Sequence, residues 1–312
     1  MAAILRIMVP YAIDDTKLTS STIPEADYPV WNSTAVYGLG DRCIKGHRIY
    51  ESQVPLTATP QNKGKDPEDL TTQFGTIVYW NDIDPTNRYA MFDGYVSTQS
   101  TATGSITVVL KAGACNMIYL DGLEGAKTVD VSIKDAPGGN VIFTYTGSLR
   151  GSRPSTYWQY WFNPFTSVKS KIITGIPPYS NMEITVTLTG TPASTVKCGV
   201  LGVGMVKALG RTQQGAEAKP KNFGYVKTDA YGKNIYKPGK KALDITGSAV
   251  IDRDEARQVQ AILVDALGLP CMISCSDLDT YSGLNNFGFC NGKVTYKTAL
   301  TSEVSFTQEG VI

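Results

Sequence analysis

The chain has 312 residues, of which 42% are hydrophobic and 18% charged, and its formal net charge is +1. This length suits two or three domains, and the balance of apolar and charged residues is typical of a folded protein and excludes a disordered tail. Lys and Arg are scattered and nearly balanced by Asp and Glu, so the chain lacks the basic footprint of a phosphate-binding surface and we expect no nucleic-acid partner.

Residues 1–30 are expected to form an N-terminal arm. Their one apolar run, MAAILRIMVP, is interrupted by Arg6 and ended by Pro10, which makes it too short for a signal peptide or a membrane span. The polar stretch that follows contains Pro24 and Pro29 and has no sustained period. We therefore predict an arm or short edge strand laid on a neighbour, in a protein synthesised in a cytoplasm.

Residues 31–92 are predicted to form a small, separate β module. Short alternating runs such as 48–50 and 76–80 are typical of strands. Exposed aromatic rings stack on sugars and anchor protein interfaces, so the aromatic side chains of this segment are the candidates for glycan or partner binding. The alternative is that they form the core of the module. The candidates are Trp31, Tyr37, Tyr50 and Trp80.

The same segment holds the few residues that could support catalysis or metal binding. His47 is the single histidine, and it stands in a tight-turn context, Lys45-Gly46-His47-Arg48, where an exposed loop histidine is the ordinary explanation. A loose calcium-loop spacing links Asp82, Asp84, Thr86 and Asp93, but Pro85 and the missing central glycine weaken the match. Turn capping and a glycosidase-like acid pair are the other interpretations of these carboxylates. We expect no catalytic residues, no cofactor and no metal beyond those weak calcium candidates.

Residues 93–209 are predicted to form an antiparallel, jelly-roll-like β-sandwich. Strand candidates recur at short spacing, with turn signals such as Gly138-Gly139 and Pro177-Pro178 between them. The predicted strands are 106–110, 117–120, 128–133, 141–145, 157–162, 183–188 and 196–203.

Residues 210–312 are predicted to form an α+β domain with one main helix. A polar stretch at 210–221 suits a linker or exposed loop, and strands are expected at 223–227, 234–237, 272–274 and 293–306. The helix is predicted over 253–267, with Asp252 and Glu255 as a capping box and Gly268 and Pro270 at its end. Its face containing Val259, Ile262, Leu263 and Ala266 should pack on a sheet.

Six cysteines are spread along the chain without an export signal, at positions 43, 115, 198, 271, 275 and 290. We expect reduced, mostly buried thiols. A metal site at Cys271, Cys275 and Cys290 is the alternative, but the spacing is unusual for zinc and no histidine is near.

Several motifs carry a resemblance to known proteins. One set of residues in the module resembles the small chitin-binding type of carbohydrate-binding module found in bacterial hydrolases and phage proteins: Trp31, Tyr37, 40–42, 49–50, Asn62, Gly64, Pro67 and Trp80. Residues 80–93 (WNDIDPTNRYAMFD) resemble a segment that recurs after such a module in phage tail and virion structural proteins. The middle region, with 120–123, 157–162 and 199–204, is similar to the galactose-binding-like sandwich of that phage family.

The resemblance implies a structural component of a bacteriophage tail or baseplate, not an enzyme. It implies a homo-oligomer that assembles with other tail or baseplate proteins and resides in the virion, with a part in host attachment. The alternative is a receptor-recognition module that uses its exposed aromatic residues to bind host surface polysaccharide. A depolymerising enzyme with paired carboxylates ranks last, because the chain offers only generic aspartates and no β-helix repeat.

Overall fold

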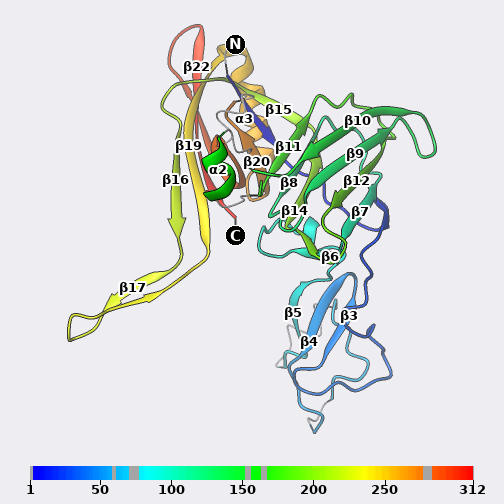
Figure 1. The fold of residues 1–312 in the computed structure, drawn as a ribbon. Helices are drawn as coiled ribbons and strands as arrows, with labels where there is room; N and C mark the ends of the chain where they lie inside the picture. Colours follow the sequence, from blue (N-terminus) through cyan, green and yellow to red (C-terminus); the bar gives the residue numbers. More distant parts are fainter. Residues whose placement is uncertain are drawn as a thin grey trace.

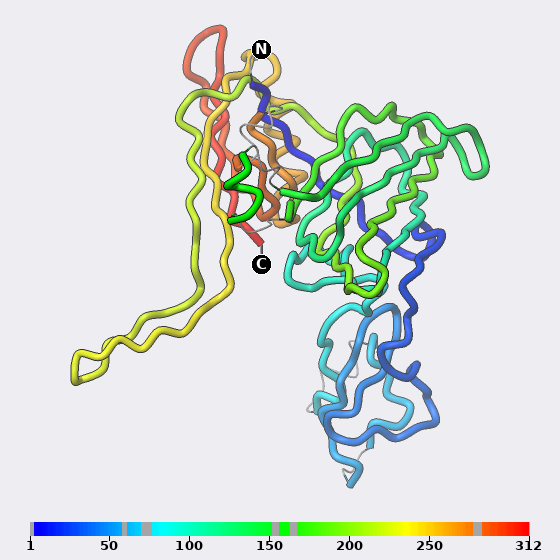
Figure 2. Tube along the Cα trace, in the orientation of Figure 1, coloured from blue at the N-terminus to red at the C-terminus, as the bar shows by residue number. Residues whose placement is uncertain are grey.

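The computed structural model describes residues 3–57, 61–69, 77–151, 156–162, 167–276 and 283–311. The chain is mainly β with several antiparallel sheets and one main helix, so the predicted fold class is confirmed. Three bodies are visible in Figures 1 and 2: a barrel that holds both termini, a sandwich beside it, and a small module that projects from the sandwich. No helix in the described ranges is long and apolar enough to cross a membrane.

The barrel is built from the two ends of the chain. Six antiparallel strands pair in the order β15-β1-β20-β21-β22-β19, and a short pairing of β15 with β19 closes the ring. A seventh strand, β16, continues the sheet beyond β19. The strands are β1 (Ile4–Met8), β15 (Val206–Thr212), β16 (Glu217–Asn222), β19 (Lys241–Asp252), β20 (Pro270–Ser274), β21 (Asn285–Tyr296) and β22 (Thr301–Gly310).

Two expectations about this region are corrected. Residues 1–30 do not form an arm laid on a neighbour, because β1 is inserted between β15 and β20 of its own chain and buries Leu5, Ile7 and Met8. The polar stretch at 210–221 is not a linker, because most of it lies in β15 and β16, which pair with β19. Backbone pairing outweighs a polar composition in these strands, since β15 buries only Leu209 and β16 pairs with β19 although all of its residues are exposed.

The predicted helix is present and covers the barrel core. A 3₁₀ turn, η2 (Arg253–Glu255), leads into α3 (Ala256–Asp265), and Val259, Ile262, Leu263 and Ala266 are buried as expected. Gly268 adopts φ +77° just after the helix, which suits a glycine stop signal. The predicted capping box is wrong: Asp252 makes no side-chain cap, and the Arg253 amide instead donates to the Leu300 carbonyl.

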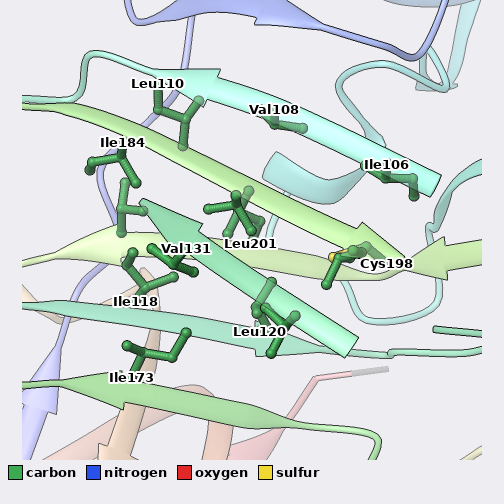
Figure 3. Close-up of a cluster of buried hydrophobic side chains, with 14 of the residues drawn as sticks. Ile106, Val108, Leu110, Ile118, Leu120, Val131, Ile173, Ile184, Cys198 and Leu201 are labelled. Carbon is green, nitrogen blue, oxygen red and sulfur yellow. The ribbon is translucent and has the colours of Figure 1, made fainter. Parts of the chain in front are cut away.

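The sandwich packs a five-stranded sheet against smaller sheets of three and two strands, with one apolar core between them. Figure 3 shows Ile106, Val131 and Ile184 of the large sheet and Ile118, Leu120 and Leu201 from the facing strands. The large sheet has the order β10-β9-β12-β7-β2 and the small ones β11-β8-β14 and β13-β6. The strands are β2 (Leu18–Ser21), β6 (Ser100–Thr103), β7 (Ser105–Leu110), β8 (Met117–Asp121), β9 (Thr128–Lys134), β10 (Val141–Ser148), β11 (Lys171–Thr174), β12 (Glu183–Thr189), β13 (Thr195–Cys198) and β14 (Val200–Gly204).

One predicted strand of the sandwich is wrong. Residues 157–162 form the short helix α2 (Tyr157–Phe162), none of whose side chains is buried. The sequence YWQYWF has no alternation of apolar and polar residues, so it offers no face with which a strand could pack on the core. High β propensity of the aromatic residues alone led to the prediction.

The small module contains a three-stranded sheet, β3 (Arg42–Lys45), β4 (Arg48–Ser52) and β5 (Trp80–Pro85), followed by the 3₁₀ turn η1 (Ala90–Phe92). The predicted run at 48–50 lies in β4; of the run at 76–80, Thr76 lies outside the described residues and only Trp80 is in a strand. Residues 46–47 form the two-residue turn between β3 and β4, with φ +53° at Gly46 and φ +65° at His47. This is the geometry that a type I′ hairpin requires.

A further antiparallel pair, β17 (Tyr225–Thr228) with β18 (Asn234–Lys237), continues from β16 and β19. Figure 1 shows this hairpin projecting far from the barrel. We call residues 217–241 the hairpin arm. Every residue of β16, β17 and β18 is exposed, so the arm adds nothing to the barrel core.

Candidate functional site

Of the four aromatic candidates in the module, two are core residues. The Trp80 side chain is 0% exposed and its indole N–H donates to the Lys65 carbonyl at 2.9 Å. The ring of Tyr37 meets it edge to face at 5.1 Å, and Tyr50 is buried in the same cluster. The alternative interpretation, that the rings form the module's own core, therefore describes Tyr50 and Trp80, whose faces are closed to a ligand.

Trp31 and Tyr37 are only partly buried against this cluster. The ammonium of Lys45 lies 4.4 Å from the centre of the Trp31 ring, which is a cation–π contact that covers one indole face. The Tyr37 hydroxyl accepts the Asn32 amide at 2.7 Å. Of the four candidates, these two keep surface that a sugar or a protein could contact.

The three weak calcium candidates have different surroundings. Asp82 accepts a hydrogen bond from Arg48 at 2.6 Å, so a cation already neutralises it. Asp93 accepts the Tyr95 amide at 2.7 Å and lines a hollow of about 280 Å³ where the module, sandwich and barrel meet. Burial raises the pKa of Asp93 to about 6, with a smaller contribution from Asp84. Within the described ranges, no group of three or more His, Cys, Asp or Glu side chains is placed to hold a metal ion.

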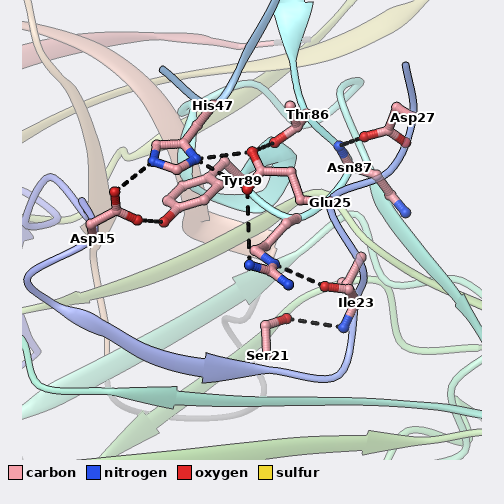
Figure 4. Close-up of polar contacts among 10 residues, drawn as sticks. Asp15, Ser21, Ile23, Glu25, Asp27, His47, Thr86, Asn87 and Tyr89 are labelled. Atoms are coloured by element: carbon pink, nitrogen blue, oxygen red, sulfur yellow. Dashed lines mark hydrogen bonds and ion pairs between the residues drawn. The ribbon is translucent and has the colours of Figure 1, made fainter. Parts of the chain in front are cut away.

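His47 joins the N-terminal segment to the module (Figure 4). One ring nitrogen lies 2.9 Å from Glu25 Oε1 and the other 2.8 Å from Asp15 Oδ2, and the ring stacks on Tyr89 at 4.1 Å. Both nitrogens face carboxylates, so the doubly protonated imidazolium fits this site because each nitrogen then donates. Burial alone would lower the pKa of His47, but the hydrogen bonds to Glu25 and Asp15 and the attraction of both carboxylates raise it.

The neighbours of His47 add further polar contacts between the N-terminal segment and the module. We call this group the His47 lock: Asp15, Glu25, His47, Thr86, Arg88 and Tyr89. The Tyr89 hydroxyl donates to Asp15 at 2.6 Å, and Thr86 donates to Glu25 at 2.8 Å. Arg88 lies 3.9 Å from Glu25 and donates to the Ile23 carbonyl at 2.9 Å. The single histidine therefore holds two segments of the fold together. Both of its ring nitrogens face carboxylates, Glu25 and Asp15.

All six cysteines are free and buried, as predicted. Burial raises the pKa of the Cys43 and Cys275 thiols to about 11 and of the Cys115 and Cys198 thiols to about 12. The thiolate is the nucleophilic form of cysteine, so these four side chains are inert at neutral pH.

Two exposed surfaces remain as candidates, and neither was among the predicted site residues. The first is α2, whose rings pair with one another: Trp158 lies 4.9 Å from Phe162, and Trp161 lies 5.4 Å from Tyr160. The second is the hairpin arm. Its exposed apolar side chains are Phe223, Tyr225, Val226, Tyr231, Ile235 and Tyr236.

A signal for both surfaces exists in the sequence. Residues 157–162 are five aromatics in six positions, more than one face of a strand can bury. Residues 223–241 place aromatic residues beside lysines with no run of buried aliphatic residues. Aromatic side chains are enriched at interfaces, so a segment that leaves several of them exposed is a candidate contact surface.

No family model matches the chain, and no curated protein matches it. Among solved structures, the chain is similar to one described as the X-ray crystal structure of reduced XRCC1 bound to DNA pol beta catalytic domain. The match has 16% identity and a TM-score of 0.20, and it covers 35% of this chain and 76% of the other. At that TM-score it supports no argument about fold or function.

Proposed function

We propose that the protein is a non-enzymatic structural component of a bacteriophage tail or baseplate, which assembles with other particle proteins and resides in the virion. The observation that supports it best is the hairpin arm: two strands that project from the barrel with every side chain exposed. An isolated two-stranded ribbon is at best marginally stable in water, so a protein that keeps one uses it against a partner.

Two further features favour this proposal. The motifs at 31–80 and 80–93 resemble those of phage virion proteins. The sandwich and the barrel share an apolar junction in which Tyr119 of the sandwich stacks on Phe287 of the barrel at 5.6 Å. A rigid body of this kind suits a scaffold that positions projecting elements.

The test is genetic and structural. The gene is deleted from the phage that encodes it, and the particles are examined by negative-stain electron microscopy. We expect particles with an incomplete tail or baseplate, restored when the protein is supplied in trans. Morphologically complete, infectious particles that lack the protein would contradict the proposal.

A second candidate function is recognition of a host surface polysaccharide. The observation that favours it is α2, where the rings of Trp158, Trp161 and Tyr157 are all exposed. Sugars present apolar faces that stack on such rings. In this function α2, rather than Tyr50 or Trp80, provides the stacking surface, and Trp31 is a second contact.

Sedimentation of the full chain with a panel of bacterial envelope polysaccharides, with and without calcium, tests this function. We expect co-sedimentation with one polysaccharide that is lost in Trp158→Ala/Trp161→Ala and kept in the matched exposed-ring variant Tyr296→Ala. Absence of binding to every polysaccharide would exclude the panel's glycans as ligands and leave the scaffold function.

A further inference from the structure

Strand β10 (Val141–Ser148) forms one edge of the five-stranded sheet of the sandwich. In the order β10-β9-β12-β7-β2 it pairs on one side only, with β9. The opposite edge is β2, which has four residues and a register shift in its pairing with β7. The two edges therefore differ, because β10 has eight residues and keeps a regular register from Phe143 to Ser148.

The outer side of β10 carries a row of backbone groups that its own sheet does not use. The Leu149 amide donates to the Lys127 carbonyl at 2.8 Å, in the register of the β10–β9 pairing. Bonded and non-bonded residue pairs alternate along an antiparallel ladder. The odd-numbered residues of β10 therefore bond to β9, and the N–H and C=O groups of Thr144, Thr146 and Ser148 point away from the sheet.

This edge lacks the features that usually protect a strand from pairing with another chain, which are charged residues, prolines and bulges. Two other edge strands have them: β16 contains two lysines and a proline, and β5 contains two aspartates and a proline. The sequence of β10, VIFTYTGS, has no charged residue and no proline. Its register shift lies between Val141 and Phe143, so the rest of the edge is open to pairing.

We propose that β10 pairs antiparallel with β10 of a second copy across a two-fold axis, which joins the two five-stranded sheets into one. This inference rests on the proposed assembly function and identifies a second copy of the chain as one of its partners. Such a contact is isologous and closes on itself, because both copies use the same edge. The outer strands of the joined sheet are then the two short β2 strands, so growth stops at the dimer.

The sequence of β10 suits pairing with itself. A two-fold axis at Tyr145 places Thr144 of each copy opposite Thr146 of the other, because Thr-Tyr-Thr reads the same in both directions. These threonines have outward backbone groups, so each such pair exchanges two hydrogen bonds. The axis also brings the two Tyr145 rings together, and threonine pairs and aromatic pairs across strands are stabilising. No charged residues face each other in this pairing.

Charge and exposure also permit the contact. The chain has a net charge of only +1, so two copies approach with little repulsion. Thr144 and Thr146 are exposed, and Val141 is 54% exposed. Phe143 and Tyr145 are only partly buried against the sandwich core, so the pairing covers apolar surface at the edge. The hairpin arm projects away from β10 (Figure 1), which leaves it free for another particle protein.

Sedimentation velocity of the full-length chain over a range of concentrations tests the contact. Thr146→Pro removes an outward N–H and no bond to β9, and an edge strand tolerates such a proline. Thr144→Lys/Thr146→Lys places lysines of the two copies opposite one another, which destabilises the pairing. The control Thr185→Lys adds a lysine in the same row of the sheet but two strands from the edge, since Thr185 pairs with Ser132 and Ser132 with Thr144. Circular dichroism verifies the fold of each variant.

We expect the wild type and the control to form dimers. Both edge variants should have a dissociation constant raised about tenfold or more, because main-chain bonds provide the affinity when a strand is added to a sheet edge. Hydrogen exchange then identifies the contact. The Thr144 amide should exchange slowly in the dimeric wild type and rapidly in the dilute monomer and in Thr146→Pro, whereas the Tyr145 amide, which faces β9, should be protected in all three.

Three results would overturn the proposal: a wild type that stays monomeric, a dimer that survives both edge variants, or a Thr144 amide that exchanges as fast in the dimer as in the monomer. The first would assign the edge to another protein or to none, and the other two would place the dimer contact elsewhere. If Thr146→Pro does not fold, the lysine variant still decides. None of these results affects the gene-deletion experiment, so the scaffold function and the β10 contact stand or fail separately.

Discussion

The module and the hairpin arm are both rich in aromatic residues, but they use them in opposite ways. In the module, Trp80 and Tyr50 close a core that Tyr37 completes at its edge. In the arm, Tyr225, Tyr231 and Tyr236 touch no core. The difference shows that aromatic density does not identify a binding surface. What separates the two is whether a third strand and a loop are present to cover the rings.

The first test of this comparison removes the Trp80 side chain from the centre of the module core. Trp80→Ala should destabilise the module by about 3 to 5 kcal/mol, because a buried indole leaves a cavity and an unpaired Lys65 carbonyl. Thermal unfolding followed by near-UV circular dichroism should lose a transition or lower its midpoint. Trp158→Ala, at an exposed ring, is the control and should leave the midpoint in place. Equal effects of the two variants would mean that Trp80 is not a core residue.

A somewhat smaller effect is expected at Asn62, a buried amide that joins three segments of the module. Its side chain accepts the Tyr37 amide at 3.0 Å and donates to the Tyr37 carbonyl at 2.9 Å and the Ser52 hydroxyl at 2.7 Å. Asn62→Ala removes all three bonds and leaves the Tyr37 amide without its acceptor, so it should cost about 2 to 3 kcal/mol in urea denaturation. Asn32→Ala, an exposed amide in the same module, should cost less. If Asn62→Ala leaves the free energy of unfolding unchanged, water takes the place of the amide.

The sequence predicted the sandwich strands well because their alternation is strict. Ile106, Val108 and Leu110 fall at every second position and all are buried, and the same holds for Val129, Val131 and Ile133. Such a pattern permits only one face toward the core. The helix over 253–267 was predicted for the analogous reason, since its apolar period is 3.6 residues.

The features that the sequence did not predict depend on contacts between segments far apart in the chain. The position of β1 between β15 and β20 joins residues 4–8 to 206–211 and 272–274, and no local pattern encodes such pairing. His47 was predicted in a tight turn, but its partners Asp15 and Glu25 lie 32 and 22 residues away. The four aromatic candidates were chosen by residue type, which cannot separate the buried Trp80 from the half-covered Trp31.

The His47 lock is intermediate between the buried core of the module and the exposed hairpin arm, because its side chains are polar and partly buried. The pKa of His47 is raised in the fold, so its stabilising contribution is complete below the unfolded value of about 6.5 and is lost as the pH rises through the folded value. The pKa of Asp15 is lowered, mainly by the hydrogen bond from Tyr89 and then by the one from His47. The stability that Asp15 contributes is therefore lost as the pH falls below about 4.

His47→Asn keeps a residue that tolerates positive φ and removes the ring. We expect a loss of about 1 kcal/mol at mildly acidic pH, because the charged hydrogen bonds are partly screened by solvent. The difference from wild type should shrink as the pH is raised through the folded pKa of His47, above which the imidazole is neutral. A difference that stays constant with pH would mean that stacking on Tyr89, rather than charge, holds the lock.

The smallest effect on stability is expected at the tip of the arm, where Tyr231 is almost fully exposed. Tyr231→Ser should change the free energy of unfolding by no more than about 0.5 kcal/mol, since it removes no buried contact from the monomer. Because we propose that the arm contacts a partner, the same substitution should nevertheless weaken assembly. Urea denaturation of the dilute protein and sedimentation of the concentrated protein, made on one preparation, separate the two quantities. A clear loss of stability in dilute solution would place Tyr231 in the fold of its own chain, and the contrast between module and arm would then disappear.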